Sequence, residues 1–194
     1  MAEIDQTIEP NWQVPTSGLM NSIPVEWRPW LLDKGSLTAR LQALCGNDLS
    51  LEIVSQCWQI PLPSERVLLS LRGKQSAFVR EVIISGAHIP WVYARSVLPE
   101  NTLSGDLKRL SELGERPLGA WLFEQPSLTR GRMEVAEIKA RYLLNLRQEL
   151  ASDSMWGRRS MFYVQGKEML VSEVFLPNFK IHARNFHQIP NLES

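Results

Sequence analysis

The chain has 194 residues, enough for one domain with a substantial core, and its apolar fraction of 44% excludes a disordered protein. It carries 21 basic and 21 acidic residues, so its formal net charge is zero. Nucleic-acid binding relies on excess positive charge, and we therefore expect no nucleic-acid partner. The two cysteines, Cys45 and Cys57, are too few for a disulfide scaffold, and we expect reduced thiols.

The first segment, residues 1–22, is polar and interrupted by prolines and Gly18, which predicts a loose N-terminal leader. It is acidic and has no apolar run, unlike a signal peptide, and no stretch of the chain approaches the ~18 apolar residues of a spanning helix. We expect a cytoplasmic protein without stable membrane insertion. We expect a single domain over residues 23–177, followed by a polar C-terminal tail over residues 178–194.

The domain begins with a helix and then changes to strands. Ser36 is a suitable N-cap for a helix with regularly spaced leucines that ends near Gly46. Alternating residues after it predict a strand over residues 49–58, and residues 65–72 are a second strand candidate. Two β-rich runs, residues 76–85 and 88–99, flank a tight turn at Gly86-Ala87 and predict an antiparallel hairpin.

The second half of the chain contains a short predicted helix at residues 103–113 and a second short helical piece or turn at residues 117–123. A final hairpin joins residues 158–165 to residues 168–177. Together these patterns predict an α+β domain with an antiparallel sheet of about six strands. Residues 127–152 begin extended and then show a helical stripe of apolar residues spaced four apart, namely Ile138, Tyr142, Leu146 and Leu150.

Several motifs of cofactor chemistry are absent from the sequence. It has no GxxxxGK[ST] phosphate loop, no GxGxxG after a strand and no GxSxG nucleophile elbow. Its three histidines, His88, His182 and His187, do not have metal-ligand spacing. We expect no metal site.

Arg80 and Glu173 stand out because each interrupts an apolar row of its predicted strand. They could lie on partly wet faces or pair with each other as a structural salt bridge. Alternatively, they form a small apolar pocket with a cation at one end and a carboxylate at the other, which suits an aromatic or cyclohexadiene acid. We expect structural roles for the other charges. The Arg158-Arg159 pair is expected at an exposed strand start, and Arg95 is expected to stack on an aromatic ring or to form a structural pair.

The segments PWVYARSVLPENTLSG, PLGAWLF, SLTR, WGRRS and SEVFLP follow the order and approximate spacing of the chorismate lyase family of ubiquinone biosynthesis. The sequence resembles that family from about Trp30 to Pro177. The resemblance implies a lyase that eliminates pyruvate from chorismate to give 4-hydroxybenzoate without a cofactor. It also implies one α+β domain with a six-stranded antiparallel sheet and helical flaps over an internal pocket.

The resemblance also assigns site residues. It places the catalytic, ligand-binding arginine at Arg80 and the carboxylate at Glu173, while Leu118 supplies backbone contacts. Leu37 stands where the family pattern has a pocket-lining methionine, and it keeps an apolar wall of similar volume. The chain is longer than the family pattern around residues 133–152, which puts flap geometry and oligomeric state in doubt.

Two alternatives remain beside the lyase. The same fold resembles the effector-sensing domains of some bacterial transcription regulators, which bind small acids without converting them; such domains follow a DNA-binding helix-turn-helix, for which we expect no room before residue 24. The other is an enzyme with a different product or an inactive relative, although retention of Arg80 and Glu173 argues against inactivity. A monomer is expected because the sequence has no long heptad run. The pathway that uses the product stays open between ubiquinone, plastoquinone and a secondary metabolite.

Overall fold

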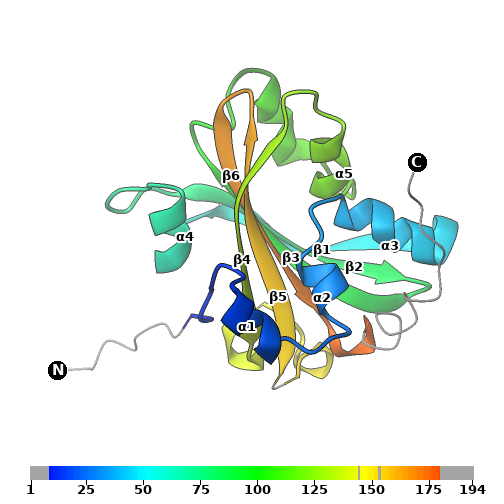
Figure 1. Cartoon of the computed structure of the whole chain (residues 1–194). Coiled ribbons are helices and arrows are strands. Elements are labelled where there is room, and N and C mark those ends of the chain that lie inside the picture. Colours follow the sequence, from blue (N-terminus) through cyan, green and yellow to red (C-terminus); the bar gives the residue numbers. More distant parts are fainter. Residues whose placement is uncertain (1–8, 144, 153, 180–194) are drawn as a thin grey trace.

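The computed structural model describes residues 9–143, 145–152 and 154–179, which form a single antiparallel sheet with helices packed on it (Figure 1). The strands are β1 (Leu49–Gln59), β2 (Ala77–Gly86), β3 (Ile89–Pro99), β4 (Thr129–Ile138), β5 (Met155–Val164) and β6 (Lys167–Phe175). Their order across the 6-stranded sheet is β1-β2-β3-β6-β5-β4, and all neighbours are antiparallel. The predicted α+β class is confirmed.

The helices are short and fill the connections between strands. In Figure 1, α3 and α5 lie near each other over one half of the sheet, and α4 projects beyond the other half. The α-helices are α1 (Ser17–Ser22), α2 (Arg28–Leu31), α3 (Leu37–Cys45), α4 (Pro63–Leu68) and α5 (Leu118–Phe123). The 3₁₀ helices are Gly46–Asp48, Gly105–Glu112, Ala140–Tyr142, Gln148–Leu150 and Pro177–Phe179.

The predicted β2–β3 hairpin is confirmed, but its turn lies one residue later than expected. Ala87 and His88 form the turn, with φ angles of 48° and 62°. Two successive positive φ angles are typical of a type I′ turn, whose twist matches that of the paired strands. Gly86 instead ends β2, where a Cβ atom would lie 2.1 Å from the Trp91 ring. The glycine is thus required for packing under the indole.

The prediction of a strand over residues 65–72 is wrong, because the chain forms α4 at Pro63–Leu68. Pro63 occupies the first helical position, where a missing N–H costs nothing. The Glu65 carboxylate accepts a hydrogen bond from the Leu62 amide at 2.9 Å and caps the helix start. The sixth strand of the sheet is β4, in the region where an extended start was expected.

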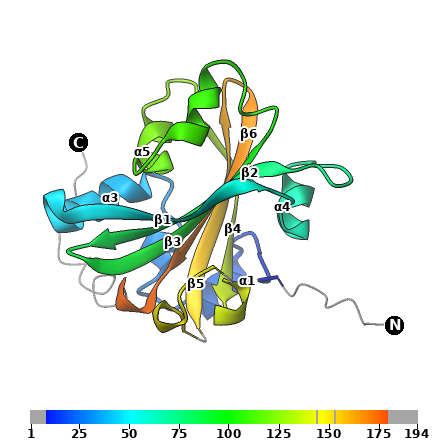
Figure 2. The ribbon, with the colours of Figure 1, turned by 180° about the vertical axis from the view of Figure 1, so that it is seen from behind.

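The helical stripe predicted within residues 127–152 is also wrong. β4 continues to Ile138, and two isolated 3₁₀ turns follow it, drawn in yellow near the lower ends of β4 and β5 in Figure 2. Ile138 and Leu146 are buried in one apolar cluster, and Tyr142 and Leu150 pack against it. The four residues therefore share a core environment although no helix connects them.

Part of the expected leader is attached to the sheet. Gln13 pairs with Val135 of β4 through hydrogen bonds of 3.0 and 2.8 Å, and Thr16 caps α1. Residues 1–8 and the tail from residue 180 onward, with His182 and His187, lie outside the described residues. Within the described part of the chain, no helix has the length and apolar character needed to cross a membrane.

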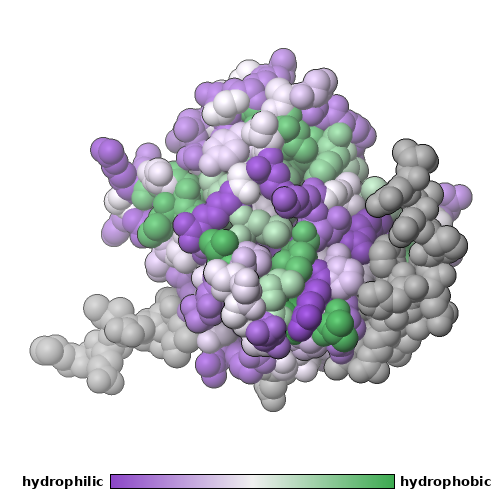
Figure 3. Space-filling view, viewed as in Figure 1, coloured by the Kyte–Doolittle hydropathy of each residue, from purple (hydrophilic) through white to green (hydrophobic). Residues whose placement is uncertain are grey.

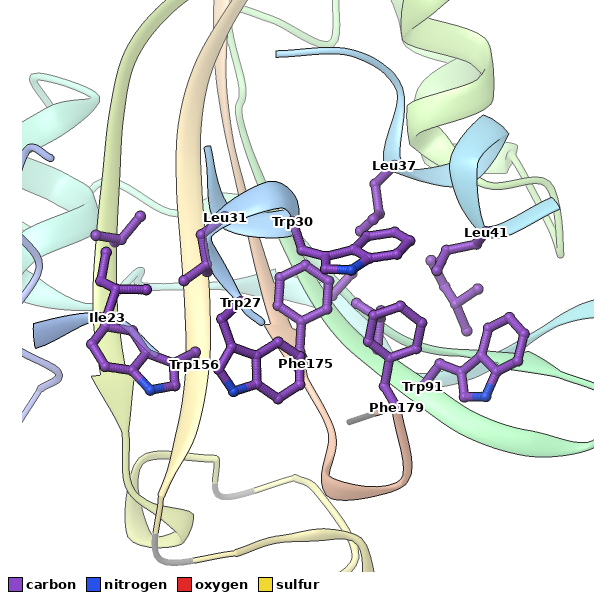
Figure 4. Close-up of a cluster of buried hydrophobic side chains, with 14 of the residues drawn as sticks. Ile23, Trp27, Trp30, Leu31, Leu37, Leu41, Trp91, Trp156, Phe175 and Phe179 are labelled. Carbon is purple, nitrogen blue, oxygen red and sulfur yellow. The ribbon is translucent and has the colours of Figure 1, made fainter. Parts of the chain in front are cut away.

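An aromatic cluster holds the segment before α3 against the sheet (Figure 4). Trp30 of α2 meets Phe179 edge-on with ring centroids 4.7 Å apart, and Phe179 stacks on Phe175 of β6 at 5.5 Å. Leu37 and Leu41 of α3 belong to the same buried cluster. Because aromatic side chains bury large apolar areas, this cluster fixes the position of α3 over the sheet.

The surface is mixed in character. In the view of Figure 3, apolar patches alternate with hydrophilic residues. The thiols of Cys45 and Cys57 are free, as predicted. Among the described residues, the exposed large apolar side chains come from several different elements and are Val14, Val25, Ile53, Trp58, Ile60, Val67, Ile89 and Phe123.

Candidate functional site

The four residues singled out from the sequence line one cavity. It lies between one face of the sheet and the helices α3 and α5. Its volume is about 40 Å³, so side chains nearly fill it. Arg80 and Glu173 come from β2 and β6, while Leu37 and Leu118 begin α3 and α5. The remaining lining residues are mainly apolar and include Val82, Ile84, Ala94, Leu122, Phe162 and Val171.

Arg80 is a buried cation held by neutral groups. The residue is 2% exposed, and its Nη1 donates to the Gln56 side chain at 2.8 Å. Its Nη2 donates to the carbonyl oxygens of Gly114 at 2.7 Å and Arg116 at 3.4 Å. None of these partners is a carboxylate, and burial lowers the pKa of Arg80. The sequence alternative of an Arg80–Glu173 salt bridge is wrong.

Glu173 pairs with a different arginine. Arg158 lies directly across from it in the β5–β6 ladder and donates from Nε to Glu173 Oε2 at 2.5 Å. The Arg158 side chain is 0% exposed, which corrects the expectation of an exposed strand start. Its Nη1 donates to the carbonyl oxygens of Trp30 at 2.8 Å and Asp33 at 2.7 Å. Arg158 therefore connects Glu173 to the segment that leads into α3.

Arg158 could have been found from sequence by the argument that singled out Arg80. Period-2 alternation along β5 places it in one row with Trp156 and Phe162, so it also interrupts an apolar row. The next residue, Arg159, points to the other face of the sheet. It is 5% exposed there and pairs with Glu134 at 2.6 Å.

Arg130 is a second cation in the cavity lining, and the sequence reasoning did not single it out. Its Nη1 donates to the Asp33 carbonyl oxygen at 3.0 Å, and its guanidinium lies 4.7 Å from the centroid of the Phe162 ring. Its Nε is buried and has no hydrogen-bond partner in the described structure. Burial and the neighbouring Arg158 lower the pKa of Arg130. The only sequence signal is the SLTR motif.

Leu37 and Leu118 line the same cavity, and each begins a helix. Each is the first residue of its helix, so its N–H has no intrahelical acceptor. Among the described residues neither amide has a hydrogen-bond partner. The Ser36 side chain caps α3 one residue further in, at the Ala39 amide. Two helix starts with unpaired first amides therefore border the cavity.

The charges around the cavity do not balance. Arg80, Arg130 and Arg158 are positive, and Glu173 is the one carboxylate among the cavity-lining residues of the described chain. Asp33 lies nearby but pairs with Arg40 at 3.1 Å. Three cations and one anion leave two positive charges without a counter-ion. Because buried charges are costly unless paired, the site is suited to a ligand with two negative charges.

A larger cavity of about 270 Å³ lies on the opposite face of the sheet. Its charges are paired: Arg95 binds Glu65 at 2.8 Å and Glu81 at 2.7 Å, and Asn145 donates to Glu81. The expected structural pairing of Arg95 is confirmed. Burial, followed by the negative charge of Glu81, raises the pKa of the adjacent Tyr93. Size favours this cavity, but its arginines already have carboxylate partners, so we assign the site to the smaller one.

Comparisons with known proteins bear on the family of the chain. The family model described as chorismate lyase matches residues 8–186. The "Probable chorismate pyruvate-lyase" of Aromatoleum aromaticum is 39% identical over 161 residues, covering 80% of this chain and 86% of that protein. The protein of the same name from Methylococcus capsulatus is 40% identical over 150 residues, covering 76% and 93%.

Solved structures show a shared fold at low sequence identity. PhnF from Mycobacterium smegmatis superposes with a TM-score of 0.54 at 15% identity, covering 76% of this chain and 66% of that one. Its effector domain alone gives a TM-score of 0.50 at 15% identity, covering 74% and 90%.

Proposed function

The chain belongs to the chorismate lyase family, and we propose that it eliminates pyruvate from chorismate to leave 4-hydroxybenzoate. The observation that carries this proposal is the small cavity that both Arg80, which has no carboxylate partner, and Glu173 line among mainly apolar residues. A cation and a carboxylate at separate positions of an apolar pocket suit a small ring acid that also carries a hydroxyl group.

In the proposed reaction the ether C–O bond of chorismate breaks and its electron pair leaves with the enolpyruvyl oxygen. The proton on the ring carbon that bears the hydroxyl is lost, and the electrons of that C–H bond complete the aromatic ring. The leaving enolpyruvate takes up a proton and becomes pyruvate. Aromatisation makes the step strongly favourable, so the protein chiefly needs to orient the substrate and match its developing charge.

Arg80 binds the ring carboxylate in this proposal, together with the amides of Leu37 and Leu118. Its planar guanidinium suits two parallel hydrogen bonds to a carboxylate. In the same proposed binding mode, Glu173 faces the ring hydroxyl of chorismate. Its Oε2 is held by Arg158, and its Oε1 has no hydrogen-bond partner in the described structure. That oxygen is the group we assign to the hydroxyl and to assisting removal of the adjacent ring proton.

The small volume of the cavity has a kinetic consequence. Ligand sites usually enclose about 300–1,000 Å³, whereas this cavity has about 40 Å³. The helices α3 and α5, which cover the cavity, must therefore move to admit chorismate and move again to release the product. The aromatic product fits the place of the ring it came from, so we expect slow release and inhibition by 4-hydroxybenzoate.

The test is a discontinuous assay. Purified protein is mixed with chorismate, without added metal or nucleotide, and 4-hydroxybenzoate and pyruvate are quantified by chromatography. Equal amounts of both products, lost in Arg80→Ala and in Glu173→Gln, are expected. Unchanged turnover in either variant would refute the role given to that residue.

A sensing function is the alternative, favoured by the shared fold with the PhnF effector domain. It predicts no turnover of chorismate but thermal stabilisation of the protein by 4-hydroxybenzoate. We also propose that the protein acts in the cytoplasm as a monomer, and that its product, 4-hydroxybenzoate, is used in quinone biosynthesis.

A further inference from the structure

Chorismate has two carboxylates, and the sites described so far account for one of them. The ring carboxylate remains on the product, whereas the enolpyruvyl carboxylate leaves with pyruvate. An enzyme that recognises both needs a second cationic group within the cavity. Arg130 is the second lining arginine, and it has no carboxylate hydrogen-bond partner in the described structure.

Arg130 is anchored but incompletely bonded. Its Nη1 is tied to the Asp33 carbonyl oxygen, and the Phe162 ring supports the guanidinium. The buried Nε has no partner, and neither does Nη2 of the adjacent Arg158. Buried donors are nearly always satisfied in folded proteins, and an unsatisfied one costs roughly 1–3 kcal/mol. One of these donors belongs to a residue that lines the cavity, and the other belongs to the arginine that holds the lining carboxylate Glu173, so an acceptor is expected near them.

The order of charges across the sheet matches the order of groups in chorismate. Arg80 is on β2, Glu173 on β6 and Arg130 on β4, and β6 is midway between the other two strands. In chorismate the hydroxyl-bearing carbon lies opposite the ring carboxylate and next to the carbon that carries the enolpyruvyl ether. A ring carboxylate at Arg80 and a hydroxyl at Glu173 therefore leave the enolpyruvyl group on the Arg130 side.

We propose that Arg130 forms a separate subsite for the enolpyruvyl carboxylate, with Nη2 of Arg158 as a second donor. This inference rests on the proposed lyase function and assigns the leaving half of the substrate to these groups. When the ether bond breaks, negative charge develops on the enolpyruvyl oxygen, close to the carboxylate that Arg130 holds. The product, which lacks this carboxylate, makes no use of the subsite.

The test compares substrate and product in matched variants. Arg130→Gln, Arg80→Gln and the control Arg132→Gln are assayed for kcat/KM with chorismate and, by calorimetry, for the Kd of 4-hydroxybenzoate. Arg132 lies on the same strand but is exposed and paired with Glu134. In Arg130→Gln we expect kcat/KM to fall roughly a hundredfold, because a buried carboxylate loses its charged partner. The product Kd should change less than about threefold, well below the loss from a deleted charged contact.

Arg80→Gln should weaken turnover and product binding together, and Arg132→Gln should change neither. Equal losses of substrate turnover and product affinity in Arg130→Gln would overturn the subsite, as would wild-type turnover. The product Kd also reports whether the variant is folded, and Arg130→Lys, which keeps the charge, should recover part of the lost kcat/KM. If wild-type protein does not convert chorismate, the proposed function fails, and the subsite fails with it.

Discussion

The pairing of Glu173 with Arg158 predicts that the carboxylate supports the fold as well as the chemistry. Glu173→Gln removes the negative charge and leaves Arg158, which is 0% exposed, without a charged partner. Losing one member of a buried ion pair costs about 3–5 kcal/mol. The Glu173 side chain is 16% exposed and glutamine can still accept a hydrogen bond, so we expect a loss of about 2 kcal/mol.

Arg158→Met should cost more, because it also removes hydrogen bonds to the Trp30 and Asp33 carbonyl oxygens. At about 1 kcal/mol for each of these bonds, the expected loss is about 4 kcal/mol. In the double variant Arg158→Met/Glu173→Gln no uncompensated charge remains at this position. Its loss should therefore be about 4 rather than 6 kcal/mol, which is a coupling energy of about 2 kcal/mol.

The assay is urea unfolding of all four proteins at one pH, with thermal melting as a second probe. For a chain of this size, 1 kcal/mol corresponds to a shift in Tm of about 2–4 °C, so Glu173→Gln should melt about 4–8 °C lower. A coupling energy below about 0.5 kcal/mol would refute the reasoning, because distant independent sites add within that limit. It would mean that the ion pair does not hold Glu173 in place.

Gly86→Ala should cost about 2–4 kcal/mol in unfolding free energy, because its Cβ atom would overlap the Trp91 ring; an unchanged urea midpoint would contradict this. Cys57 is exposed, whereas burial, with the nearby Asp48 charge, raises the pKa of Cys45. A disulfide reagent at neutral pH should therefore modify one thiol quickly and the other slowly, and equal rates would refute that difference. Burial raises the pKa of Glu168, so its contribution to stability is present at low pH and lost as the pH rises through that pKa. Glu168→Gln should raise Tm at pH 7 but not near pH 4; an equal shift at both would rule out ionisation as the cause.

The sheet and its two charged positions could be predicted from sequence because strand alternation is strict. In β2 and β6 a single charge interrupts an apolar row, and the structure places both charges on one cavity. The same rule indicates Arg158, although the local WGRRS motif favours a basic pair at an exposed strand start. Alternation assigns its two arginines to opposite faces, and both are buried.

Other parts of the fold could not be predicted, because short apolar runs fit either secondary structure. Residues 65–72 have the pattern of a strand, but Pro63 and Glu65 favour a helix start, and the chain forms α4 there. The apolar spacing of four that predicts a helix has another origin here. The end of β4 and the two turns after it pack on one apolar cluster, which contains or contacts Ile138, Tyr142, Leu146 and Leu150. The role of Arg130 depends on Asp33, which is far away in sequence, and no local pattern indicates that contact.

The two faces of β2 show why we base the proposed site on charge balance rather than on cavity size. Arg80 and Glu81 are adjacent in sequence and point to opposite faces, each into a cavity. Glu81 is bound by Arg95 and Asn145, so the charge on its face is already compensated and the network serves to hold the strand. Arg80 has only neutral oxygens, although its burial is as deep. Folding stability alone does not account for a buried cation left in this state, whereas binding of an anionic substrate does.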